Sequence, residues 1–295
     1  MQASDDSIAR QTTPLSFEKT QELLRHMVIP SAPAVLLELH EAMQADDPDI
    51  GQIADAVGRD AGIAAMVLRT VNSPFFGLRH KVASIRQATA LLGLLNIGNI
   101  VAGLALRRAL EHGDEEPPPH FWESPANVAM IAAMLAQRYG GMPPDEAYLL
   151  GLFRDAGEVI MAQRFPDYPA FLRELREQER DQVAEEERRY ATNHAQISYI
   201  VSTRWGLPRH VRDIILRHHE AEDFLREDGG VSSEPRTLMA VLKMAEHIDA
   251  VFWGRKEDAE WERIAATTLN YLGVSSLEFL DVTEDMVDLL IAGQG

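Results

Sequence analysis

The chain has 295 residues, a formal net charge of −18, and hydrophobic and charged fractions of 46% and 25%. This composition is typical of a globular protein with a buried core, and without cysteine the chain has no disulfide, no thiol catalysis and no thiolate-bound zinc. So acidic a surface disfavours nucleic-acid binding. No apolar run approaches the roughly 20 residues that cross a bilayer. We therefore expect this protein to bind neither nucleic acid nor a membrane.

The N-terminal part of the chain is predicted to be a bundle of helices. We expect residues 1–15 to be disordered and a first helical subdomain to span residues 16–112. The polar start of the chain has no apolar stretch like that of a secretory signal, which indicates a cytoplasmic, bacterial-type protein. Asp60 is a good N-cap for the segment AGIAAMVLRTV. Ser84 begins two apolar helical stretches, within which Gly93 and Gly98 permit close approach or a bend.

An acidic and proline-rich segment marks a boundary between subdomains. The sequence EHGDEEPPPH cannot continue a helix through its three prolines, so we place a linker at residues 113–120 and a second subdomain at residues 121–295. Three final helices should close this second subdomain, after predicted helices near residues 121–138, 144–164, 167–178, 194–205 and 208–219. The predicted fold is therefore all-α, with two packed helical bundles.

Several histidines and carboxylates beyond the linker could serve as metal ligands, because a hydrolytic centre needs such groups to converge from different helices. They are Asp155, His194, His218, His219, Glu246 and His247. The histidines also fit ordinary positions at helix ends. Asp155 is harder to explain structurally, because a buried carboxylate must be paired or neutralised. Arg154 is the nearest cation in sequence, although adjacent residues of a helix point about 100° apart.

The segment NSPFFG is predicted to form a tight corner after a helix. Asn72 and Ser73 can bond to local backbone groups, Phe75 and Phe76 supply apolar surface, and Gly77 can adopt a positive φ. The corner fits either a packed junction between helices or a surface that binds a partner.

Taken together, these segments resemble the HDOD family, the HD-related output domains, over roughly residues 20–250. IPSAPAVLLELHEAM resembles the opening helix of the family, and Asn72, Ser73, Phe75, Phe76 and Gly77 fit its signature turn. The second subdomain matches through LLGLFRDAGEVIMAQRFP, NHAQISYIVSTRWGLP and VRDIILRHHE. The resemblance implies that the second bundle is HD-like.

The resemblance also implies a degenerate metal site. Catalytic HD and HD-GYP relatives use a first histidine, a His-Asp pair, later histidines and a late aspartate. Here Ser124 stands near the first position, Arg154 precedes Asp155 in place of the paired histidine, and Glu246 lies near the late aspartate. His194 and one of the pair His218 and His219 match the later histidines. An arginine cannot coordinate a metal, so we expect no metal, no cofactor and no catalysis.

The leading interpretation is a stand-alone, non-enzymatic signalling scaffold that contacts other signalling proteins, as the resemblance implies. One alternative is a divergent metal-dependent phosphohydrolase that uses Asp155, His194, His218 and Glu246. Another is a nucleotide-binding sensor without catalysis, for which a small nucleotide is possible but not expected. If the centre is degenerate, Arg154 is expected to pair with Asp155 or Glu246 in place of the metal, unless it extends to solvent along its helix.

Overall fold

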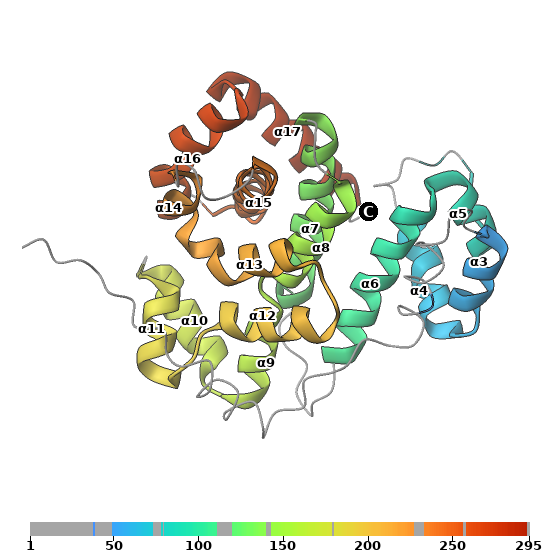
Figure 1. The fold of residues 1–295 in the computed structure, drawn as a ribbon, viewed down its shortest axis with the longest axis horizontal. Helices are drawn as coiled ribbons and strands as arrows, with labels where there is room; N and C mark the ends of the chain where they lie inside the picture. The colour runs from blue at the N-terminus through green and yellow to red at the C-terminus, as the bar shows by residue number, and fades with distance from the viewer. Residues whose placement is uncertain are drawn as a thin grey trace, which may run out of the picture.

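All the regular elements in the described part of the chain are helices, as the computed structural model shows (Figure 1). The all-α prediction is therefore confirmed. The structure describes residue 38 and residues 49–72, 78, 80–110, 120–139, 143–178, 180–226, 233–255 and 258–293. Outside these residues lie the predicted disordered segment 1–15, the linker except for its last residue, and Ser73, Phe75, Phe76 and Gly77 of the signature turn.

The first group of described helices comprises α3 (Ile50–Gly58), α4 (Ala61–Val71), α5 (Ile85–Leu92) and α6 (Leu94–Leu110). Side-chain capping bonds mark the starts of α3, α4 and α5. The Asp60 carboxylate accepts hydrogen bonds from backbone amides in the first turn of α4, and the Ser84 hydroxyl accepts one from the third residue of α5, as predicted. Gly93 has a φ of +81° and separates α5 from α6.

Asn72 ties the end of α4 to the segment that precedes α5. Its Nδ2 donates to the carbonyl of Leu68 at 2.7 Å and to that of Val82 at 2.9 Å, and its Oδ1 accepts from the Val82 amide at 2.7 Å. One side chain therefore satisfies backbone groups on both segments, in keeping with the local bonding predicted for this position.

The remaining helices form a larger group around α15. They are α7 (His120–Tyr139), α8 (Pro144–Phe153), α9 (Ala156–Arg164), α10 (Tyr168–Glu177), α11 (Gln182–Tyr190), α12 (His194–Arg204), α13 (Arg209–Arg217), the 3₁₀ turn η2 (His218–Glu220), α14 (Ala221–Arg226), α15 (Ser233–Phe252), α16 (Ala259–Leu272) and α17 (Ser276–Gly293). Helix α15 packs against α7, α8, α13, α14, α16 and α17 (Figure 1).

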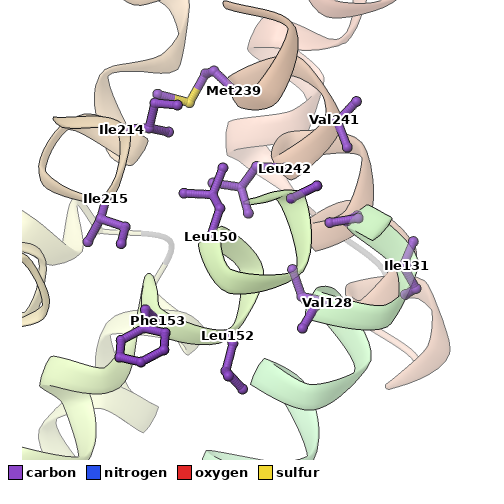
Figure 2. Packing of buried hydrophobic residues seen from close by; sticks show 14 of the residues in the cluster. Val128, Ile131, Leu150, Leu152, Phe153, Ile214, Ile215, Met239, Val241 and Leu242 are labelled. Carbon is purple, nitrogen blue, oxygen red and sulfur yellow. The ribbon is translucent and has the colours of Figure 1, made fainter. Parts of the chain in front are cut away.

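Two hydrophobic cores correspond to these two groups of helices. The smaller core is built from α3, α4, α5 and the first part of α6, around Ile53, Val67 and Ile97. The larger core begins with Leu106 and Leu110 at the end of α6 and continues to α17. Helix α6 packs on α8, so it belongs to both cores and connects the two bundles. In Figure 2, side chains of α7, α8, α13 and α15 meet in the larger core.

The prediction of one continuous helix over residues 144–164 is wrong. The chain forms two helices there, α8 and α9, which are separated at Arg154 and Asp155. Asp155 has a φ of −108° and a ψ of 14°, outside the helical range. The sequence is apolar on both sides of the break, so hydrophobic periodicity does not reveal it. The sequence does not predict helix α11 either, because the segment QVAEEERRY is highly charged and has little apolar pattern.

Within the described part of the chain, no helix combines the length and the apolar character that a membrane span requires.

Gly157 allows α9 to approach the start of α12 very closely. A Cβ atom at this position would lie 2.1 Å from the carbonyl oxygen of His194. The Gly157 amide also donates to the Ser198 hydroxyl at 2.8 Å. This contact sets the distance between the helix that begins after Asp155 and the helix that carries His194.

We predict that Gly157→Ala lowers the free energy of unfolding by about 3 kcal/mol, because overpacking forces the backbones of two helices apart. Gly58→Ala is the matched control: it lies at the end of α3, where an added methyl group would meet no atom within 4 Å, and it should leave stability unchanged or raise it by up to about 1 kcal/mol. Urea unfolding followed by circular dichroism measures both variants. Equal stabilities would contradict the prediction.

Candidate functional site: a buried ion-pair network beside a histidine cluster

The break between α8 and α9 places Arg154 and Asp155 side by side in the interior. Arg154 still has helical dihedral angles at the end of α8, whereas Asp155 leaves the helix and precedes α9. Only 4% of the Arg154 surface is exposed. Because the backbone turns between them, two neighbouring side chains reach the same interior point, which a continuous helix would not permit.

Arg154 uses its guanidinium to join three parts of the chain. Its Nε donates to Oε1 of Glu246 on α15 at 2.7 Å, and its Nη2 lies 3.0 Å from Oδ2 of Asp155. Its Nη1 donates to the carbonyl of Gly151 at 2.5 Å. The sequence predicts that Arg154 pairs with Asp155 or Glu246; this is confirmed, since it pairs with both, and the alternative in which Arg154 extends to solvent is wrong.

These contacts decide the charge of Asp155. Burial by itself raises the pKa of its carboxyl group, but the Arg154 guanidinium and the nearby imidazoles of His218 and His194 outweigh burial and hold that pKa well below its usual range. Asp155 is therefore an ionised carboxylate, with Oδ2 directed at Arg154.

A second buried cation, Lys243, holds the other oxygen of Glu246. Its Nζ lies 2.9 Å from Oε2 of Glu246 and donates to Oε1 of Glu260 on α16 at 2.7 Å. Only 2% of Lys243 is exposed. Both oxygens of Glu246 therefore face a cation, which lowers the pKa of its carboxyl group against the effect of burial. Sequence reasoning missed Lys243, although it lies one helical turn before Glu246.

Ser124 bonds to a different carboxylate, that of Asp249. Its hydroxyl donates to Oδ2 of Asp249 at 2.6 Å, and Asn127 on the same helix donates to Oδ1 at 2.9 Å. Burial raises the pKa of the Asp249 carboxyl group. Asp249 was also missed, and its only signal in the sequence is an acidic residue three positions after Glu246 on an apolar helix.

His194, His218 and His219 come together on the other side of Asp155. His194 is the first residue of α12, after its cap Asn193, while the other two lie in η2. One ring nitrogen of each histidine lies within 4.8 Å of the others. Oδ1 of Asp155 lies 3.4 Å from Nε2 of His218 and 3.7 Å from Nε2 of His194. The tertiary structure thus brings together three of the predicted candidates from two segments.

A buried carboxylate on α11 orients His194. Oε2 of Glu186 accepts from the His194 amide at 2.8 Å and lies 2.7 Å from its Nδ1, while Oε1 accepts from the hydroxyl of Tyr168 and from Gln182. Burial lowers the pKa of His194, but the carboxylates of Glu186, Asp155 and Glu158 outweigh it and raise the pKa to about 9. These carboxylates therefore favour a positive charge on the His194 imidazole.

His219 behaves differently from His194. Burial and the positive charge of neighbouring histidines lower its pKa well below the ordinary value, so its imidazole is neutral. His247, the remaining candidate, lies elsewhere: its Nδ1 is 3.0 Å from Oδ2 of Asp258, and its ring stacks on Trp261.

The ligand set that the HD resemblance predicted does not fit a metal ion. The Ser124 hydroxyl is bonded to Asp249, Arg154 has no lone pair to donate, and both oxygens of Glu246 face cations. Among the described residues, the group with suitable ligand atoms is the cluster of His194, His218 and His219.

The sequence matches the model of the HDOD domain over residues 29–221, which is more than half of the chain. It also aligns with a protein of Treponema pallidum (strain Nichols) at 25% identity over 230 residues, which covers 73% of this chain and 44% of that protein. This chain therefore spans less than half the length of that curated relative.

Solved structures share the fold. An HDOD domain protein from Geobacter sulfurreducens superposes with a TM-score of 0.71 at 21% identity, over 93% of this chain and 94% of that one. A protein from Shewanella amazonensis SB2B, provisionally named a phosphohydrolase, gives a TM-score of 0.68 at 21% identity over 91% and 96% of the two chains. A protein from Marinobacter aquaeolei VT8, provisionally named a signal transduction protein, gives 0.66 at 23% identity over 93% and 59%.

We predict that Arg154→Ala lowers the free energy of unfolding by about 3–5 kcal/mol, because it leaves the partly buried carboxylates of Asp155 and Glu246 without their counter-charge. Arg209→Ala is the control: that side chain is 86% exposed and lies 3.7 Å from Asp213, so its loss should change stability by no more than about 0.5 kcal/mol. Denaturant unfolding of both variants measures the difference. A cost for Arg154→Ala as small as that of the control would show that the network does not stabilise the fold.

Proposed function

Because this chain belongs to the HDOD family, we propose that it is a non-enzymatic regulatory scaffold that acts through contacts with other signalling proteins. The single observation that carries the proposal is the buried guanidinium of Arg154, bound to both Asp155 and Glu246. A cation in this position takes up the two carboxylates that a catalytic HD centre would use for its metal.

The electrostatics of the site support a structural role for these carboxylates. A hydrolytic metal needs ligands with free lone pairs and an open position for water. Here Glu246 is shared between Arg154 and Lys243, and these ion pairs join α8, α15 and α16. If a metal took Asp155 and Glu246, Arg154 would become a buried cation without a counter-charge and Lys243 would keep Glu260 alone, which costs several kcal/mol.

The names of the similar proteins fit either a signalling role or a phosphohydrolase role. The Marinobacter protein is provisionally named for signal transduction, and the Shewanella protein for phosphohydrolysis. We favour signalling for this chain because its own residues at the HD positions oppose the metal-dependent reaction. A metal-dependent phosphohydrolase is the alternative that an activity assay separates.

We predict that the purified protein does not hydrolyse phosphoesters or cyclic dinucleotides in the presence of Mn²⁺, Mg²⁺, Fe²⁺ or Ni²⁺. The physical reason is the lack of a nitrogen ligand at both Ser124 and Arg154. Release of phosphate or linear product above the rate without protein is the measurement. Turnover that requires metal and disappears in Asp155→Ala would overturn the non-enzymatic assignment.

The proposed partner surface is the first helical bundle and its junction with the second, since the HDOD signature segment lies there and loops carry recognition more often than core helices. Leu91, at the end of α5, offers an apolar side chain that is 57% exposed. Among the described residues of the first bundle, it is the large apolar side chain with the greatest exposure, which makes it a suitable probe of this surface.

We predict that Leu91→Glu reduces capture of partner proteins from the native lysate by about tenfold or more, because an interface that buries a carboxylate loses at least about 1.4 kcal/mol. Leu277→Glu is the matched control, since Leu277 is 70% exposed on α17 of the second bundle. Quantitative affinity capture with the full chain compares the two. Loss of partners in the Leu277 variant alone would move the contact surface to the second bundle.

A further inference from the structure

Helix α17, at the edge of the second bundle (Figure 1), has two apolar faces. Its inner face packs into the larger core through four buried side chains, those of Phe279, Val282, Met286 and Leu290. Its outer face carries three exposed apolar side chains: Leu277 is 70% exposed, Leu280 52% and Ile291 59%. A helix at the surface of a globular protein needs one apolar stripe and is polar elsewhere. Packing within the fold therefore does not explain the outer face.

The three exposed side chains form one narrow stripe along α17. At 100° per residue, Leu280 and Ile291 lie within about 60° of Leu277 around the helix axis. The stripe is about 21 Å long at 1.5 Å per residue, and it lies about 140° away from the centre of the buried face. Single exposed apolar side chains are ordinary on a protein surface, whereas a contiguous group of them indicates a binding site.

The polar side chains of α17 are acidic. Its sequence contains no Lys or Arg and five carboxylates, those of Glu278, Asp281, Glu284, Asp285 and Asp288. Glu284 lies within the stripe, while the three aspartates lie along one edge of it. These four residues are exposed, and none of them forms an ion pair with another described residue. The outer face therefore combines an apolar stripe with an unbalanced row of negative charge.

This charge restricts what can cover the stripe. A second copy of the chain packed through the same face would bring two rows of carboxylates together, and like charges across an interface oppose association. The phosphates of nucleic acids and the anionic lipids of a membrane surface are repelled in the same way. A basic segment fits both features, because its apolar side chains can cover the stripe while its Lys or Arg side chains lie beside the aspartates.

We propose that the outer face of α17 binds a basic amphipathic helix of a partner protein. Such a helix presents apolar side chains at a spacing of three or four residues, which matches a stripe of about four turns. Contacts with Leu277, Leu280 and Ile291 hold the partner, and the row of carboxylates sets its orientation and speeds its association. The face lies outside residues 29–221, which match the HDOD domain.

This face and the proposed surface of the first bundle take different partners, so neither proposal depends on the other. Leu277→Glu places a carboxylate within the stripe. It should therefore weaken the binding of a basic helix and leave the capture of proteins that bind through Leu91 unchanged.

The test uses the full chain and a defined probe, a fluorescently labelled amphipathic peptide of Leu and Lys. A length of about 18 residues is enough to cover the stripe. We expect saturable, one-to-one binding that weakens as the salt concentration rises from about 50 to about 300 mM. The same peptide with Glu in place of Lys should bind at least about tenfold more weakly. Failure of the Lys peptide to bind, or equal binding of both peptides, would overturn the proposal.

Neutral substitutions locate the binding face. Leu280→Gln removes apolar surface without changing the charge, and it should weaken binding of the Lys peptide about tenfold or more. Leu91→Gln is the matched control, because Leu91 is 57% exposed on α5 of the first bundle, and it should bind as the unaltered chain does. Both positions are exposed, so both variants should fold. Equal affinity of the two variants would show that the peptide binds the acidic surface in general, against the proposal.

Two further measurements test the chemistry of the partner. Asp288→Asn should weaken binding about two- to fivefold and reduce its dependence on salt, whereas Asp213→Asn, on α13, should change neither. Sedimentation of the unaltered chain tests the competing occupant. A dimer that Leu280→Gln dissociates would show that a second copy covers the stripe, and the proposal of a basic partner would then be wrong.

Discussion

The buried ion pairs of Arg154 are the interaction on which the rest of the second bundle depends. A guanidinium removed from water is tolerated only when its donors are paired, and these donors reach Asp155 beside it, Gly151 one turn earlier and Glu246 on α15. The break between α8 and α9 follows from the same requirement, because a continuous helix would direct Asp155 away from Arg154. Helix geometry and buried charge are therefore coupled at one position.

We expect this network to contribute to specificity as well as to stability. The apolar core shared by α7, α8, α13 and α15 supplies the main driving force for folding. Apolar side chains tolerate small shifts of register, whereas ion pairs do not, so Arg154 and Lys243 specify how α8 and α16 meet α15. Buried polar groups have this role in some proteins. A bundle with apolar residues at these positions would retain its core and lose this constraint.

Asp155 lies at the boundary between two chemically different halves of the site. Its Oδ2 faces Arg154 and the cationic side, and its Oδ1 faces the histidines of α12 and η2. Because the guanidinium of Arg154 binds Oδ2, it leaves Oδ1 directed at the histidines. The family resemblance assigns one role to each position, whereas the carboxylate of Asp155 contacts both Arg154 and the histidines.

The sequence by itself determined the features that depend on local contacts. The all-α class, the caps at Asp60 and Ser84 and the break at Gly93 were predictable, since capping bonds join residues two or three positions apart. The pairing of Arg154 with a carboxylate was also predictable, from the cost of a buried charge. The tertiary structure alone decided that Glu186, Lys243 and Asp249 belong to the site, and that three histidines meet at one point. Those contacts join different helices, and the spacing of residues along the sequence does not show which helix faces pack against each other.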